Sequence, residues 1–154
     1  MLQILVDGDA CPVKDEIYKV AVRHKIPVRL VANSWIRMPD HPLLSFELVS
    51  DGFDAADDSI AAAATSETIV VTADILLAER CLKSNARVIS PNGKPFTENS
   101  IGSAVATRAI MADLRAGVGT ENVGGPKPFT KSDRSTFLQA LDTEITRLKR
   151  TLKT

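Results

Sequence analysis

Cysteine is scarce in this sequence, which contains only Cys11 and Cys81. Two cysteines are too few for a framework of disulfide bonds or for a metal site built from thiolates. Cys11 lies close to Asp9, whose negative charge disfavours a thiolate. We therefore expect both cysteines to pack as small apolar side chains.

Long hydrophobic runs are also absent, since no stretch approaches the roughly 20 apolar residues that span a membrane. The N-terminus starts directly with the strand-like segment LQILV and lacks the basic region and apolar core of a signal peptide. No internal repeat or low-complexity tract is present. These absences predict a cytoplasmic protein with no membrane partner.

The overall composition is that of an ordinary globular protein, with 44% hydrophobic and 25% charged residues in a chain of 154. This length suits one domain, residues 1–154, that buries roughly 70% of its unfolded surface. The zero net charge conceals an acidic part, residues 1–100, and a basic part, residues 101–154. A cation bound by the first and a phosphate-bearing ligand held by the second fit this asymmetry, as does an ordinary solvated surface.

Short apolar runs alternate with segments of helical periodicity through the first 90 residues. The predicted strands are residues 2–6, 28–32, 46–50, 68–72 and 87–90. The predicted helices are residues 13–24, 57–65 and 75–84. Strands that alternate with helices are typical of a largely parallel sheet with helices on both faces. The sequence therefore predicts a three-layer α/β/α fold with a sheet of about five strands and C-terminal helices.

The C-terminal part predicts helices on either side of a segment rich in glycine and proline. A helical pattern over residues 101–116 leads into that segment, residues 117–133. In the last helix, apolar side chains recur at helical spacing, at Phe137, Leu141, Ile145, Leu148 and Leu152. We expect this stripe to face the core rather than to form a groove for a partner.

Acidic residues follow two of the predicted strands. Asp7 and Asp9 come directly after the apolar run ILV, and Asp74 comes two residues after TIVVT. Asp57 and Asp58 open the predicted helix 57–65, which comes before the strand TIVVT. In an open α/β sheet, ligands bind beyond the carboxyl ends of the strands, where the strand order reverses. If the chain returns after the third strand, so that the strand TIVVT lies on the other side of the first strand, these carboxylates face one another.

Each of these acids also has a simpler interpretation as a helix cap, because Asp9, Asp57 or Asp58, and Asp74 all lie near predicted helix starts. Capping does not explain why three acidic positions lie at the same edge of the sheet. Lys14 is the only basic residue adjacent to them in sequence. Crowded carboxylates repel one another unless a cation neutralises them. Mg²⁺ or Mn²⁺ suits a site of a few carboxylates plus waters, so the sequence predicts a divalent metal site.

A metal of this kind activates water and stabilises a phosphodiester transition state, so basic side chains should lie nearby to hold a nucleic-acid backbone. The candidates, each of which also suits an ordinary surface position, are Lys14, Arg37, Arg108 and Arg115. Trp35, in the loop after the second strand, is able to stack on a base, but core packing is the role that we expect. His24 and His41 are isolated, and we expect a catalytic role for neither.

At these residues the sequence resembles the YaiI/YqxD family of bacterial proteins, whose fold is similar to the PIN and NYN nuclease domains. The segments that carry the resemblance run in order through nearly the whole chain: VDGDACPVK, GFDAADDSI, VVTADILLAE, SPNGKPFTENSI and GGPKPFTKSDRSTF. The family usually opens with V-D-A-D-A-C-P, so Gly8 departs from the pattern while both acids remain. The segment GGPKPFTKSD has no counterpart in ordinary PIN domains.

The resemblance implies a PIN-like domain with a carboxylate site. By position, Asp7 resembles the acid at the end of the first PIN strand, and Asp57, with its neighbour Asp58, resembles the acid of the central helix. Asp74 resembles the acid after the fourth strand. Asp54 also matches the family signature, although a structural role at the start of a helix explains it equally well. PIN-like domains cleave RNA with Mg²⁺ or Mn²⁺, and the resemblance implies the same activity here.

Three functional hypotheses follow, of which the first is a metal-dependent ribonuclease. In it, Asp7, Asp57 and Asp74 ligate Mg²⁺ or Mn²⁺, and Asp9 or Asp58 completes the metal shell or orients water. The nucleic acid is RNA rather than DNA in this hypothesis, and the catalytic residues are Asp7, Asp9, Asp57 and Asp74.

Two alternatives stay open. In a haloacid-dehalogenase-type phosphatase, Asp7 attacks a phosphate and Asp9 acts as acid and base, but that chemistry needs a downstream lysine before a late acidic pair, and here the pair Asp57 and Asp58 comes too early. The third hypothesis is a PIN-like module that binds RNA or a metal without catalysis.

Overall fold

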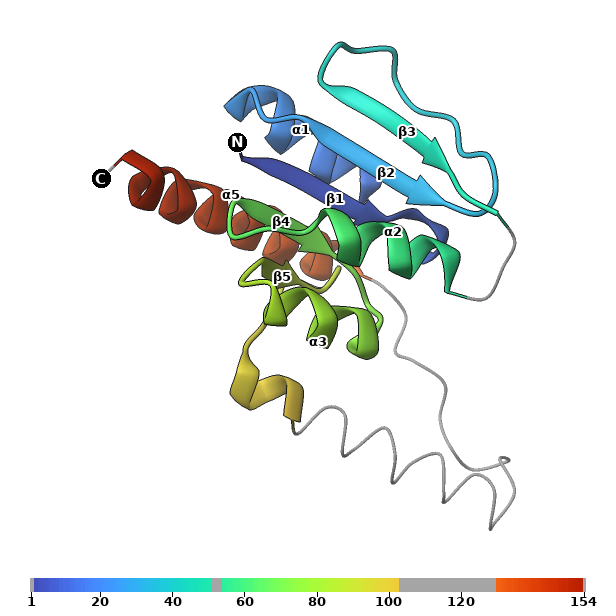
Figure 1. Ribbon diagram of the computed structural model, residues 1–154. Coiled ribbons are helices and arrows are strands. Elements are labelled where there is room, and N and C mark those ends of the chain that lie inside the picture. The colour runs from blue at the N-terminus through green and yellow to red at the C-terminus, as the bar shows by residue number, and fades with distance from the viewer. Residues whose placement is uncertain (1, 51–53, 103–129, 154) are drawn as a thin grey trace.

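The structure is a computed structural model that describes residues 2–50, 54–102 and 130–153. A six-stranded sheet runs through the molecule in the order β3-β2-β1-β4-β5-β6 (Figure 1). The first five strands are parallel, and β6 is antiparallel to β5. The strands are β1 (Gln3–Asp7), β2 (Val28–Ala32), β3 (Leu44–Leu48), β4 (Thr68–Val71), β5 (Arg87–Ile89) and β6 (Pro95–Phe96).

Helices cover both faces of the sheet (Figure 1). One face carries α1 (Lys14–His24) and α5 (Lys131–Lys153), and the other carries α2 (Ala55–Ala63) and α3 (Ile75–Lys83). A single 3-10 turn, η1 (Gly8–Ala10), joins β1 to α1. Residues 98–102 are also helical. The predicted α/β fold, with a mostly parallel sheet and helices on both faces, is confirmed.

The central strands are apolar on both faces because helices cover each face. In β1, Ile4 and Val6 pack in the core layer beneath α1 and α5, whereas Leu5 packs in the layer beneath α2 and α3. Successive side chains in a strand point to opposite faces. Asp7 therefore follows Leu5 onto the α2 and α3 face, where β1 ends.

The strand order reverses between β1 and β4. The chain passes outward from β1 through β2 to β3, and then returns to pair β4 with the free side of β1. Val6 lies opposite Val71 in this pair, so that the next residues, Asp7 and Thr72, come side by side at the carboxyl ends of the strands. The sequence analysis brings the acids together only if the chain returns to the free side of β1 after β3, and this return is confirmed.

The last helix packs against the core as its apolar stripe predicts. Phe137, Leu141 and Ile145 are completely buried, and Leu148 is nearly so. Leu152 is 43% exposed, because the helix continues beyond the edge of the core. Hydrophobic burial on this scale makes α5 an integral part of the fold.

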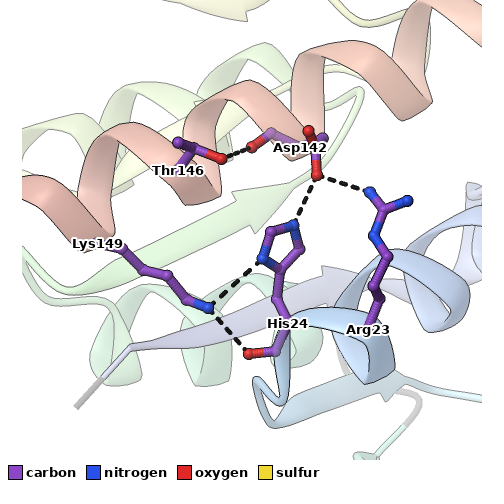
Figure 2. Close-up of polar contacts among 5 residues, drawn as sticks. All are labelled: Arg23, His24, Asp142, Thr146 and Lys149. Atoms are coloured by element: carbon purple, nitrogen blue, oxygen red, sulfur yellow. Dashed lines mark hydrogen bonds and ion pairs between the residues drawn. The ribbon is translucent and has the colours of Figure 1, made fainter.

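A polar cluster fixes the end of α1 to α5 (Figure 2). Asp142 accepts hydrogen bonds from Arg23, at 2.7 Å, and from His24 Nε2, at 2.6 Å. Lys149 Nζ donates to the backbone carbonyl of His24 at 3.0 Å. His24 thus joins the two helices.

Three details differ from the sequence prediction. The sheet has a sixth strand, because a turn through Gly93, whose φ is 87°, folds Pro95–Phe96 back against β5. β3 begins and ends two residues earlier than predicted, since its pairing with β2 over Leu44–Leu48 sets its limits. α2 begins at Ala55, directly after Asp54, and not at Asp57.

The predicted helix 101–116 and the segment 117–133 fall mostly outside the described residues. Within the described part of the chain, no helix is long and apolar enough to cross a membrane.

Candidate functional site

Asp7 lies at the carboxyl end of β1 and is held by the neighbouring strand. Thr72, which is 1% exposed, donates a hydrogen bond from Oγ1 to Asp7 Oδ2 at 3.0 Å. Burial raises the pKa of the Asp7 carboxyl, and the negative charges of Asp9 and Asp74 raise it further, while the Thr72 hydrogen bond opposes them. Asp7 is thus a partly buried acid that faces other acids.

Asp74 caps the N-terminus of α3. Its Oδ1 atom accepts hydrogen bonds from the backbone nitrogens of Leu76, at 2.9 Å, and Leu77, at 3.2 Å. Its own backbone nitrogen donates to Thr72 Oγ1 at 3.0 Å. The capping interpretation is therefore confirmed for Asp74. The same carboxylate also acts electrostatically on the rim, because its charge raises the pKa of Asp7 and of Asp57.

Asp57 comes from the first turn of α2. Burial raises its pKa to about 6, and Asp74, Asp7 and Asp54 add to the shift, which Arg80 opposes. The helix does not use Asp57 or Asp58 as its cap, since its N-cap residue is Asp54, in the left-handed conformation with φ 65°. The capping interpretation of Asp57 and Asp58 is therefore wrong.

The two remaining predicted acids are engaged elsewhere on the rim. Asp58 accepts a hydrogen bond from Arg80 of α3 at 2.9 Å, and both side chains are largely exposed. Asp9, also exposed, accepts from the backbone nitrogen of Asn33 at 3.1 Å, just after β2 ends. It caps no helix. The charges of Asp7 and Asp74 thus act on Asp57, and the charge of Asp9 acts on Asp7 more strongly than that of Asp74 does.

The donor set of this rim fits a hard divalent cation. The acids supply only oxygen ligands, and their mutual repulsion is the imbalance that a cation relieves. Among the described residues, no three His, Cys, Asp or Glu side chains lie close enough together to hold a metal ion by themselves. Mg²⁺ is commonly held by one or two carboxylates plus waters, and that arrangement is the one compatible with this rim.

The predicted basic residues are only partly placed by the structure. Lys14, at the start of α1, donates from Nζ to the backbone carbonyl of Cys11 at 3.0 Å. Arg37 is exposed in the loop between β2 and β3, and within the described residues it has no ion-pair partner. Arg108 and Arg115 lie outside the described residues.

Trp35 does not pack in the core, because its side chain is 72% exposed. The core prediction for this residue is wrong. Ile36 and Met38 pack against the core in its place, and the alternation of the loop leaves Trp35 and Arg37 facing outward.

The family model described as "Uncharacterized BCR, YaiI/YqxD family" matches residues 5–147, a range that includes all five predicted metal ligands. The chain belongs to the YaiI/YqxD family. Similar proteins of this family include a "UPF0178 protein" of Sphingopyxis alaskensis, which is 67% identical over 97% of this chain and 96% of its own length. Another, from a Jannaschia species, is 62% identical over 95% and 94% of the two chains. No solved structure matches the chain.

Sequence reasoning missed two residues that organise the rim of this YaiI/YqxD protein. Thr72 connects Asp7 to Asp74, and Arg80 binds Asp58. A signal for Thr72 exists, since a hydroxyl side chain that ends a run of buried β-branched residues needs a hydrogen-bond partner. No sequence signal identifies Arg80, because its partner lies on another helix.

Other features of this YaiI/YqxD protein lie away from the rim. Two surface cavities, each of about 360 Å³, lie beside α5, and none of the predicted site residues lines them. Cys11 and Cys81 are free and buried, as predicted, and burial raises the pKa of the Cys81 thiol to about 11. His41 accepts a hydrogen bond from the nearby backbone of Leu43.

Proposed function

We propose that this protein is a metal-dependent nuclease that hydrolyses phosphodiester bonds of RNA at the rim formed by Asp7, Asp57 and Asp74. The observation that carries the proposal is that these three carboxylates come from β1, α2 and the start of α3, and that their charges act on one another at the switch point of the sheet. Ligand sites of open α/β sheets form at this point. The resemblance to PIN and NYN domains supports the same assignment.

In this proposal Mg²⁺ or Mn²⁺ is the cofactor, bound directly by one or two of Asp7, Asp57 and Asp74 and through water by the rest, with Asp9 and Asp58 available to its outer shell. The bound ion supplies an activated water and stabilises negative charge on the phosphate in the transition state.

The protein's own groups fix the acids in place. Thr72 orients the Asp7 carboxylate, and the first turn of α3 orients Asp74 through two backbone N–H groups. Preorganised ligands of this kind bind without further loss of side-chain freedom.

Cationic side chains near the rim are suited to hold the RNA backbone. The Lys14 ammonium has three donors, of which the Cys11 carbonyl uses one. Arg37 is exposed on the β2–β3 loop. We propose that both contact phosphate groups, and that Arg108 and Arg115 extend this contact.

The test is cleavage of a labelled single-stranded RNA in Mg²⁺ and in Mn²⁺ by the wild type, Asp7→Asn and Glu98→Gln. Glu98 is an exposed acid after β6, distant in the sheet order from β1, so its variant controls for the loss of one charge. We expect the wild type and Glu98→Gln to cleave, and Asp7→Asn to lose cleavage while it keeps its fold by circular dichroism. Equal cleavage by Asp7→Asn contradicts the assignment, and RNA binding without cleavage in either metal favours a non-catalytic module.

A further inference from the structure

We propose that Trp35 is a base-stacking platform that directs single-stranded nucleic acid to the acidic rim. This role rests on the proposed function, because the rim is the place where the bound strand would be cut. It adds the class of substrate, an unpaired strand, and the residue that selects it.

The exposure of Trp35 calls for a binding role. It is the single tryptophan of the chain, and its side chain is 72% exposed. An indole left in water forgoes the large favourable free energy of burial. The loop that carries it is anchored, since Ile36 and Met38 pack against the core. The anchored loop thus presents its largest apolar side chain to solvent.

The location of Trp35 connects it to the acids. The backbone nitrogen of Asn33 donates to Asp9, so the loop is tied to the rim two residues before Trp35. Two residues of chain reach at most about 7 Å. On the other side, Val49 donates to the carbonyl of Ala32 at 2.9 Å, which keeps the end of β3 against the start of the loop. The indole therefore lies within a short reach of Asp9, at the carboxyl ends of the strands.

The charge beside Trp35 favours a nucleic acid over a peptide. Arg37 is exposed at the next outward position of the loop and, in the part of the chain that the structure describes, has no ion-pair partner. A base on the indole and a phosphate on the guanidinium are the two contacts by which proteins hold single strands. Stacking on an aromatic ring needs an unpaired base, so duplex RNA does not satisfy this site.

The first measurement uses the fluorescence of Trp35, which no other tryptophan obscures. A single-stranded phosphorothioate oligoribonucleotide, which resists hydrolysis, is added to the wild-type protein in Mg²⁺ buffer. We expect a saturable change in fluorescence with the single strand and none with the duplex of the same sequence.

The second measurement is the affinity for the same oligonucleotide carrying a fluorophore, followed by anisotropy. We expect Trp35→Ala to weaken binding about tenfold or more, and Trp35→Phe to weaken it less because the aromatic face remains. Leu152→Ala, which removes an exposed apolar side chain at the far end of α5, should bind as the wild type does.

Several outcomes overturn the role of Trp35: no binding of the single strand, binding without a change in tryptophan fluorescence, an equal response to duplex, or equal affinity of Trp35→Ala. The two proposals fail separately. Cleavage with the same KM by the wild type and Trp35→Ala keeps the nuclease and removes the stacking role. Stacking on Trp35 without cleavage in any divalent metal removes the nuclease and keeps Trp35 as a binding residue.

Discussion

The hydroxyl of Thr72 donates to the carboxylate of Asp7 across the β1–β4 pair, and the same oxygen accepts the backbone N–H of Asp74. One buried side chain thereby sets the positions of two acids that come from different parts of the chain. The bond to Asp7 also lowers the pKa of that carboxyl against the opposing effect of burial.

Replacing Thr72 by valine should therefore raise the pKa of Asp7. Valine has nearly the same shape but cannot donate to the carboxylate or accept from Asp74, so we also expect the free energy of unfolding to fall by about 1–3 kcal/mol. The measurement is an NMR titration of the Asp7 side-chain carboxyl, together with urea unfolding. Thr72→Ser keeps the hydroxyl and should keep the lower pKa. An unchanged titration in Thr72→Val would contradict the role of this bond.

Asp57→Asn should stabilise the metal-free protein at neutral pH. The pKa of Asp57 is about 6 in the folded state, against an ordinary value of 3.8 for an aspartate. Between these values the folded state binds more protons than the unfolded state, so stability falls as pH rises through this window. At pH 7 the ionised Asp57 thus destabilises the fold, and because solvent screens a side chain that is only partly buried, its removal should raise the free energy of unfolding by on the order of 1 kcal/mol.

Urea unfolding in a chelating buffer at several pH values measures this effect. The gain should disappear below the unfolded pKa, where both states are protonated, and Glu98→Gln should show no comparable gain. A lower stability of Asp57→Asn at pH 7 would mean that its carboxylate has a stabilising partner.

Asp142→Asn should weaken the attachment of α5 to α1 (Figure 2). The hydrogen bond from His24, and then that from Arg23, lower the pKa of Asp142. A lowered pKa contributes stability above the unfolded value of 3.8 and loses it as pH falls through the folded value. Because the side chain is 43% exposed, solvent screens the pair, and we expect a loss of about 0.5–1 kcal/mol at pH 7.

The difference in urea midpoint between the wild type and Asp142→Asn should narrow as the pH is lowered below 3.8, the unfolded pKa of Asp142. Asp15→Asn, which changes an exposed acid on α1, provides the control. A difference in urea midpoint that stays constant down to the lowest pH measured would show that the charge of Asp142 does not hold the helices together.

Gly8→Ala should destabilise this chain. A Cβ atom at Gly8 would lie 2.8 Å from Leu30 Cδ1 and 3.2 Å from the carbonyl oxygen of Val31. Leu30 is completely buried, so its side chain has little room to move. We expect a loss of about 1–2 kcal/mol in the free energy of unfolding.

A double-mutant cycle with Leu30→Val tests the cause. Valine lacks the terminal methyl group that meets the new Cβ, so the two changes together should cost less than the sum of the single changes. Additive losses would show that the contact with Leu30 is not the reason.

The sequence by itself determined the elements and the fold class, because both depend on local patterns. Alternating apolar runs and helical periodicities place β1, α1, β2, β4, α3 and β5 to within about two residues. The same patterns point to Asp7, which comes directly after an apolar run, and to Asp74, which comes two residues after one. Buried strands end where polar residues begin, and this signal is present without any knowledge of the fold.

Only the tertiary structure decided which of the acids act together. The register of β1 against β4 places Thr72 within hydrogen-bonding distance of Asp7. The packing of α2 against α3 pairs Asp58 with Arg80, while the charges of the neighbouring acids act on Asp57. The sequence predicts core packing for Trp35, but Ile36 and Met38 pack against the core instead. These outcomes depend on contacts between residues far apart in the chain, and local periodicity does not encode such contacts.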